Sequence, residues 1–181
     1  MNKVIHLKSR ITAFIMALLL CIVGLPMPEA GITAYASTSS KWTDNAASAI
    51  TGGTGTETDP YRITTAAELA LLASNNETYK TASFKLMNDI DLSAHEWVPI
   101  EEFGGTFDGD GKSITGLKIG AADAAAEDLV NKHVGLFGKV TGTVKDLTVN
   151  AAIYVSDASS EANYGAGIIA GGLSGTIDNC I

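Results

Sequence analysis

Two aspartates in the segment DGDGKS, Asp108 and Asp110, have a type and spacing that could bind a metal ion. Calcium takes about six to eight oxygen ligands, and an EF-hand loop starting at Asp108 would need a glutamate at its twelfth position. Ile119 stands there, which excludes an EF-hand. A looser calcium site that also uses acidic residues between 89 and 96 stays open. The alternative is a tight turn with two solvated carboxylates.

The acidic pair Asp89 and Asp91 and the segment HEWVP at 95–99 suggest two further chemistries. Glycosidases need two carboxyl groups about 5 to 9.5 Å apart across a sugar cleft. Asp89 and Asp91 instead alternate with apolar residues, which is typical of the solvated face of a strand. A zinc-protease helix needs a second histidine where Pro99 stands. We therefore expect no catalytic residue and no cofactor.

The tetrapeptide Gly135, Leu136, Phe137 and Gly138 could suggest phosphate binding. A phosphate loop requires a Lys-Ser or Lys-Thr pair at fixed spacing and a helix after it, whereas a strand-like sequence follows here. The structural alternative places Leu136 or Phe137 in a core and the glycines where neighbouring backbones leave no room for a Cβ atom. We favour packing over ligand binding.

The charge of the chain limits its partners. The whole sequence has a net charge of −8, and residues 37–181 hold nine lysines and arginines against nineteen aspartates and glutamates. Such a chain repels nucleic acid and anionic lipid. The partners that we expect are cell-wall material, a host or matrix protein, or a glycan. Cys180 is the only cysteine in that part, so it forms no intramolecular disulfide.

The N-terminal residues have the pattern of a signal peptide. A basic start precedes an apolar run from Ile11 to Leu25, and Ala34, Tyr35 and Ala36 form an A-x-A cleavage site. We expect a secreted, cell-surface protein that is not held in the membrane after cleavage. The predicted organisation is a signal peptide at 1–36, a linker at 37–60, an N-terminal capping helix within 61–81 and strand repeats over 82–181.

Helical periodicity gives way to strand periodicity near residue 82. Thr65 and Glu68 match a capping box at the start of a short helix, with Leu69, Leu72 and Ala73 on its apolar face. From residue 82 onward, apolar residues alternate with polar ones, as in β-strands.

Three segments in the second half repeat one pattern. An offset of 30 residues places GGTFDGDGKSITGLKI on VGLFGKVTGTVKDLTV, with Phe107 on Phe137. The segment AGIIAGGLSGTIDNCI follows at offsets of 32 and then 33, which predicts a one-residue bulge at 170–172. The predicted repeat residues are Gly105, Phe107, Ile114, Leu117, Ile119, Gly135, Leu136, Phe137, Gly138, Val144, Leu147, Val149, Gly167, Ile168, Ile177 and Cys180.

A strand repeat of about 30 residues predicts an all-β solenoid in the form of a parallel β-helix. Residues 82–181 would form about three coils, stacked about 4.8 Å apart. Since the end of such a stack exposes unpaired strand edges, the short helix is expected to cap the N-terminal end. The last copy stops inside a strand without a similar cap, so we expect the sequence to be truncated at its C-terminus.

These segments resemble the repeats of GLUG-motif proteins, secreted or cell-surface bacterial proteins named for the tetrapeptide that Gly135, Leu136, Phe137 and Gly138 match. The resemblance covers about residues 54–181, and the third copy departs from it because Ala170 replaces the closing glycine. It implies a right-handed β-helix that serves as a stalk or adhesion module. It also implies possible catalytic domains elsewhere in a longer parent, as in immunoglobulin-A-cleaving metallopeptidases, but no catalytic residues within the motif.

We therefore expect a non-catalytic extracellular module with a structural or adhesive role on the bacterial surface. One alternative is a glycan-binding or glycan-cleaving β-helix, whose sugar-stacking surface could use Trp97, Tyr154 and Tyr164. Such aromatic residues more often pack in a core or a loop. The other alternative is the non-catalytic N-terminal part of a surface peptidase.

Overall fold

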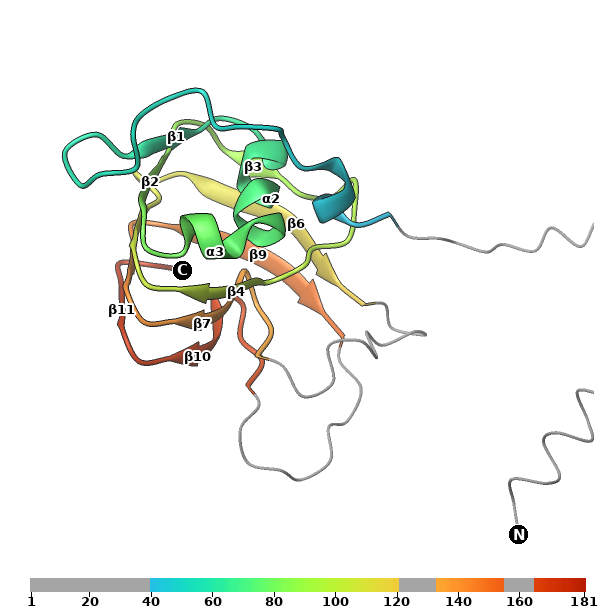
Figure 1. The fold of residues 1–181 in the computed structure, drawn as a ribbon. Coiled ribbons are helices and arrows are strands. Elements are labelled where there is room, and N and C mark those ends of the chain that lie inside the picture. Colours follow the sequence, from blue (N-terminus) through green and yellow to red (C-terminus); the bar gives the residue numbers. More distant parts are fainter. Residues whose placement is uncertain (1–39, 121–132, 155–164) are drawn as a thin grey trace, which may run out of the picture. The chain divides into compact units, whose positions relative to one another are not determined.

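The computed structural model describes residues 40–120, 133–154 and 165–181, all within one compact unit, Thr38–Ile181. The predicted signal peptide lies outside the described residues. The described part is mainly β-strand, with a few short helices (Figure 1). None of its helices is long and apolar enough to cross a membrane. The elements are η1 Trp42–Asn45, β1 Tyr61–Ile63, α2 Ala66–Ser74, α3 Asn76–Tyr79, β2 Ser83–Leu86, β3 Ile90–Asp91, β4 Ile100–Phe103, β5 Thr106–Asp108, β6 Ser113–Ile119, β7 Phe137–Val140, β8 Thr143–Lys145, β9 Thr148–Ile153, β10 Ala170–Leu173 and β11 Thr176–Asp178.

The strands form three sheets in which every described pair is parallel. Sheet 1 has the order β1-β2-β5-β8-β11, sheet 2 the order β4-β7-β10, and sheet 3 the order β3-β6-β9. The chain visits sheets 2, 1 and 3 in that order through β4, β5 and β6, and again through β7, β8 and β9. We call each such passage a coil. The all-β, parallel arrangement expected from the sequence is confirmed.

The register of sheet 1 corrects the predicted offset of 30 residues. Phe107 pairs with Val144, 37 residues further along the chain. Phe137 lies in sheet 2 instead, where it pairs with Ile100. The predicted alignment of Phe107 with Phe137 is therefore wrong, because a phenylalanine shortly after a glycine occurs in two different sheets.

Unequal turns explain why one offset could not fit the whole coil. In sheet 3, Ile114 pairs with Val149, 35 residues on, and not with Val144 as the alignment placed it. The earlier coil therefore uses two more residues from Phe107 to Ile114 than the later coil uses from Val144 to Val149. The longer turn contains the DGDG segment.

The last coil is close to the predicted register, but its irregularity lies earlier than expected. Val134 bridges to Ala166, an offset of 32, and Phe137 pairs with Ala170, an offset of 33. The change of one residue thus falls before Ala170, and the predicted bulge at 170–172 is wrong in position.

The inward side chains form one continuous core. Phe107, Phe137 and Phe103 pack together, with ring centroids 5.0 Å apart for Phe103 and Phe137 and 5.5 Å apart for Phe107 and Phe137. Aliphatic residues of all three sheets join them. Most of the predicted repeat residues of the first two copies are fully buried, namely Phe107, Ile114, Leu117, Ile119, Leu136, Phe137, Val144 and Leu147.

The N-terminal part contributes to this core as well. The capping box has the expected geometry, because Glu68 N–H donates to Thr65 Oγ1 at 3.2 Å and Thr65 N–H donates to Glu68 Oε2 at 3.2 Å. Helix α2 lies beside the first strands, at the end of the sheets opposite β10 and β11 (Figure 1). Within the predicted linker, Trp42 is buried and its Nε1 donates to Leu92 O at 2.9 Å.

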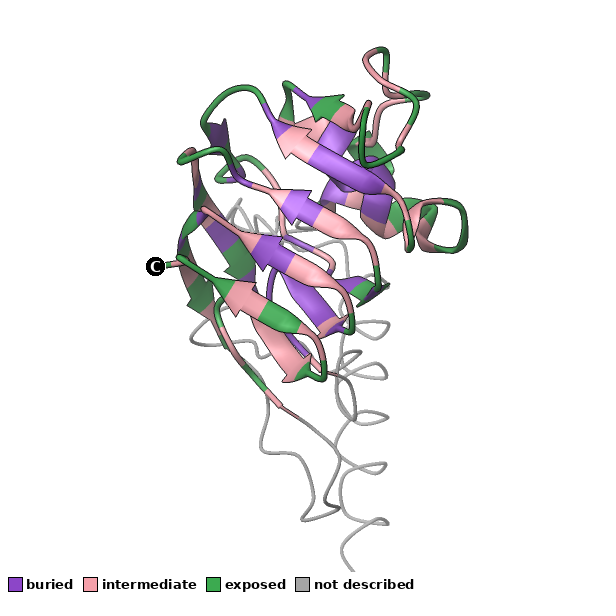
Figure 2. Ribbon diagram, turned by 90° about the vertical axis from the view of Figure 1, so that its left-hand side faces the viewer, coloured by how far each residue is buried: buried purple, intermediate pink, exposed green. Residues whose placement is uncertain are grey.

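The last described coil is the least covered part of the core. Ile168 is 49% exposed, although the corresponding Leu136 of the preceding coil is fully buried. Ile177 and Cys180 are half-buried against the core. The colours of Figure 2 change accordingly from purple in the inner strands to pink and green in β10 and β11.

Candidate functional site

The outer face of sheet 1 carries a row of alternating charges, which we call the charge ladder. It consists of Lys85, Asp108, Lys145 and Asp178, each in register with the next on neighbouring strands. Each follows an inward residue of its strand, so the alternation of side chains in a β-strand turns all four outward. Lys145 Nζ lies 3.0 Å from Asp108 Oδ2. The hydrogen bond to that carboxylate raises the pKa of Lys145.

Both calcium candidates have lysine partners. Asp108 contacts Lys145, and Asp110 Oδ1 lies 2.9 Å from Lys85 Nζ. The hydrogen bond from Lys85 lowers the pKa of Asp110. Asp108 Oδ1 also accepts the backbone N–H of Asp110 at 2.9 Å, which closes the turn. A cation bound by these two carboxylates would have two lysine ammonium groups as neighbours, which would repel it. The described residues contain no group of three or more histidine, cysteine, aspartate or glutamate side chains that could hold a metal ion.

The acidic pair of the β3 region has structural partners too. Asp89 Oδ1 accepts both the backbone N–H and the hydroxyl of Ser113, at 2.8 and 2.9 Å. Asp91 Oδ1 accepts the backbone N–H of Ser93 at 2.8 Å. These hydrogen bonds lower the pKa of each carboxyl group. A general acid of a glycosidase requires the opposite shift.

The two described histidines lie in different surroundings. His95 Nδ1 is 2.6 Å from Ser40 Oγ, and its ring packs edge-on against Trp42 with centroids 4.8 Å apart. His133 lies against Gly172 of the last coil, and its Nδ1 is buried without a hydrogen-bond partner among the described atoms. The structure therefore assigns neither of them to a metal site within the described residues.

The tetrapeptide at 135–138 is packed between coils. Leu136 and Phe137 are fully buried. A Cβ atom at Gly135 would overlap the carbonyl oxygen of Gly167, and one at Gly138 would lie 2.7 Å from Glu101 O. The glycines are therefore explained by close backbone approach, as the sequence suggested.

Gly105, Gly142 and Gly175 form a second glycine column, of which the predicted offset of 33 matched Gly175 with Gly142 but the offset of 30 misplaced Gly105. They precede β5, β8 and β11, and a Cβ atom at each would overlap a backbone carbonyl oxygen of the preceding coil. Gly105 was aligned with Gly135, whereas a Cβ atom at Gly142 would overlap Gly105 O. The column marks where the chain passes from sheet 2 into sheet 1.

Of the two readings of the aromatic residues, core packing holds for Trp97. Its side chain is only 2% exposed, and Nε1 donates to Leu136 O at 3.0 Å. Tyr154 is 44% exposed, and Tyr164 lies outside the described residues. A stacking surface that uses Trp97 is therefore excluded.

Cys180 occupies the inward position after β11. Its Sγ lies 3.8 Å from Val144 O and 3.2 Å from Asp178 O. Burial raises the pKa of the thiol. The group is therefore held as the neutral thiol, which fits packing better than nucleophilic chemistry.

The charge ladder had a sequence signal that the alignment did not use. The segments SFKL, TFDG, TVKD and TIDN share a small polar residue, then an apolar one, then a lysine or an aspartate in turn. Reading the segments on these three positions gives the observed register of sheet 1.

Comparison with known proteins gives two relatives at moderate identity. A protein of Evansella cellulosilytica named "Putative Gly-rich membrane protein" is 33% identical over 144 residues, and Halomucin of Haloquadratum walsbyi is 32% identical over 152 residues. These matches cover 73% and 74% of this chain but only 15% and 2% of the relatives' lengths. No protein-family model matches the chain, and no solved structure matches it.

Proposed function

We propose that the chain forms a right-handed parallel β-helix of the GLUG-repeat type and serves as a non-catalytic structural or adhesive module at the cell surface. The observation that carries this proposal is the repeated passage of the chain through the same three parallel sheets. Parallel crossover connections are right-handed in about 98% of cases. A stack of this kind presents long, regular outer faces, which suit a spacer or an adhesive surface.

The polar groups of these outer faces support a structural role. The carboxylates that could have served a glycan-cleaving enzyme accept hydrogen bonds from Ser93 and Ser113. Asp108 and Asp110 pair with lysines. Groups that are already paired and ionised are poor general acids at neutral pH.

The surface location rests on two further observations. The sequence of residues 1–36 has the features of a signal peptide. One relative is named as a membrane protein. The acidic charge of the chain favours cell-wall material, a matrix or host protein, or a neutral glycan as partner over nucleic acid.

The location is tested by expressing the whole chain in a Gram-positive host and fractionating the culture. We expect the product in the cell-wall or medium fraction, with an N-terminus at Ser37 by sequencing. The variant Ala36→Phe should block cleavage and retain the precursor in the membrane fraction. A full-length product in the cytoplasm would refute the proposed location.

The role is tested by binding the secreted product to purified cell walls, matrix proteins and immobilised glycans, alongside release of reducing sugar from polysaccharides. We expect saturable binding to one of these materials without release of sugar. Sugar release that is lost in Asp89→Asn would refute a non-catalytic role and support the glycan-cleaving alternative.

A further inference from the structure

The first strand of each sheet is closed by a segment that is not a strand. In sheet 1, the N–H of Arg62 in β1 donates to Gly52 O at 2.8 Å. After β3 of sheet 3, Glu96 N–H donates to Ser40 O at 3.0 Å and Trp42 N–H donates to Glu96 O at 2.9 Å. In sheet 2, β4 is bonded to α3 and to the residue that follows it. First strands otherwise offer free N–H and C=O groups to strands of other chains.

In sheet 2, the closure is made by the side chain of Asn76. Its Nδ2 donates to Glu102 O at 2.9 Å, and Glu102 N–H donates to its Oδ1 at 3.4 Å. A primary amide carries a donor and an acceptor, as a peptide group does. Two residues that exchange both bonds in this way form the hydrogen-bonded pair of an antiparallel ladder. One side chain therefore occupies the place of an antiparallel strand beside β4.

Helix α3, which carries Asn76, is only lightly packed. It is a single turn of four residues, all of which are at least partly exposed. The ring of Tyr79 contacts those of Tyr61 and Phe84, with centroids 5.6 and 6.2 Å apart. Just after the helix, Lys80 O accepts the N–H of Gly104 at 2.7 Å. The helix adds little to the core, whereas its polar groups bind the edge of β4.

The exposed side chains of β4 oppose the same kind of pairing. Glu101 and Glu102 are consecutive and both are exposed. Charged side chains on an edge strand discourage pairing with other chains. A two-fold axis that brought β4 of a second copy against this edge would run the two strands antiparallel and place glutamates near glutamates. Like charges directly opposite each other are destabilising.

We propose that Asn76 is a built-in substitute for an antiparallel strand, which keeps β4 from pairing with β4 of a second copy. The amide blocks the N–H and C=O of Glu102, and the two glutamates repel an approaching copy. The contact is autoinhibitory, because it binds the groups through which the edge would otherwise associate. It concerns self-association of the folded chain and does not depend on the proposed structural or adhesive role.

Hydrogen exchange and sedimentation of the whole chain test the two parts of this block. In Asn76→Ala, exchange of the Glu102 amide should accelerate at least about tenfold, because its acceptor is gone, while that of Gly104 changes less. A double variant with Glu101→Thr and Glu102→Thr removes the charges and keeps Asn76, so it should stay monomeric. Adding Asn76→Ala to the double variant should give a dimer with a dissociation constant at least about tenfold lower. Protection of the Glu102 amide should return in that dimer.

A matched variant in the same helical turn separates the open edge from a loosened helix. Thr78 Oγ1 donates to Asn75 Oδ1 at 2.8 Å, a bond that stabilises the turn without involving β4. Thr78→Ala, placed in the double variant instead of Asn76→Ala, should lower the Tm by a similar amount and leave the chain monomeric. Equal association in the two backgrounds would overturn the proposal, because loosening of α3 would then suffice.

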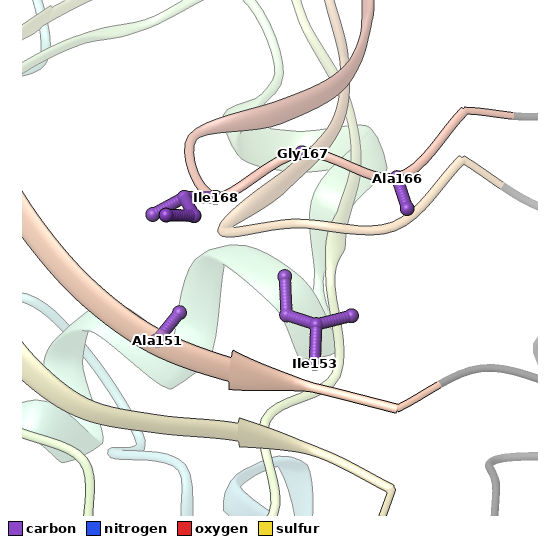
Figure 3. Close-up of a pocket in the computed structure, with 5 residues that line it drawn as sticks. All are labelled: Ala151, Ile153, Ala166, Gly167 and Ile168. Atoms are coloured by element: carbon purple, nitrogen blue, oxygen red, sulfur yellow. The ribbon is translucent and has the colours of Figure 1, made fainter.

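A variant at the other end of sheet 2 shows where the copies meet. Ile168 lies just before β10, is 49% exposed and lines an apolar hollow (Figure 3). Adding Ile168→Asp to the triple variant should leave its dimer intact. Loss of the dimer would place the contact at the last coil and overturn the proposal. So would a triple variant that stays monomeric although its Glu102 amide exchanges freely, or unchanged exchange of that amide in Asn76→Ala.

Discussion

Adjacent glycines at the start of β5 offer a sharp test of the coil packing. Gly105→Ala would place a Cβ atom over the carbonyl oxygen of Ala82, 2.8 Å from its carbonyl carbon and 2.9 Å from the carbonyl carbon of Thr81. All three are backbone atoms, so relief requires the two coils to move apart. Gly104→Ala meets only the hydroxyl oxygen of Thr141 at 3.1 Å and Lys80 O at 3.6 Å.

The free energies of unfolding of the two variants should differ by about 2 to 3 kcal/mol. Overpacking of this kind costs about 1 to 3 kcal/mol and occasionally more, and contact with three backbone atoms places Gly105→Ala near the upper end. In either variant, alanine lowers the conformational entropy of the unfolded chain, which stabilises the folded state by about 0.4 to 1 kcal/mol. We expect a net loss of about 2 to 3 kcal/mol for Gly105→Ala and a change within about 0.5 kcal/mol for Gly104→Ala.

Thermal and urea unfolding of the two variants measures this difference. A loss of about 2 to 3 kcal/mol lowers the Tm by about 6 to 10 °C in a domain of this size. Circular dichroism before unfolding should show the same strand content in both variants. If Gly105→Ala unfolds together with Gly104→Ala, the close approach of the coils at this corner is refuted.

Three further changes test other parts of the fold. Leu147→Asp places a charge at a residue that is 1% exposed, and it should abolish cooperative unfolding, because an unpaired buried charge costs several kilocalories per mole. The pKa of Asp89 is lowered by Ser113, so this interaction contributes stability above the ordinary carboxyl pKa of about 3.9 and loses it as the pH falls through the lowered value. Ser113→Ala removes the hydroxyl that donates to Asp89. Its urea midpoint should therefore be lower than that of the wild type at pH 6 and approach the wild-type value at pH 2. Asn179 has a φ of +47°, and its side-chain amide donates to Asp146 Oδ1 at 2.6 Å. Asn179→Ala and Asn179→Gly both lose that bond. In chemical denaturation, Asn179→Ala should be less stable than Asn179→Gly by about 1 kcal/mol, because only glycine adopts a positive φ without strain.

The sequence predicted well those features that depend on local chemistry. The capping box at Thr65 and Glu68 needs only residues three apart, and it was found where expected. Glycines at 135 and 138 could be assigned to close packing because their neighbours are strongly apolar. Both features depend on the identities of a few adjacent residues.

Register could not be obtained in the same way, because the core accepts any apolar residue of suitable size. Phe107, Val144 and Ile177 occupy equivalent inward positions although their side chains differ widely. An alignment that rewards identical residues therefore chose Phe137 for Phe107, in the wrong sheet. Core packing was the commoner expectation for Trp97, but its hydrogen-bond partner could not be named from the sequence, because Leu136 O lies 39 residues away.

The outward residues resolve this ambiguity, and that suggests what the charge ladder contributes. Exposed ion pairs such as Lys145 with Asp108 add only about 0 to 1 kcal/mol to stability. A strand that slipped onto the wrong rung would instead place lysine opposite lysine, or aspartate opposite aspartate, and like charges directly opposite are destabilising. Since the apolar column tolerates such a slip and each coil has a glycine at the same place, the alternating charges are the feature that distinguishes one coil from the next. The charges of sheet 1 should therefore act mainly on the choice of register. Replacing Lys145 by alanine and Asp108 by asparagine, which keeps an oxygen for the backbone N–H of Asp110, should leave the Tm nearly unchanged while increasing misfolded product on refolding.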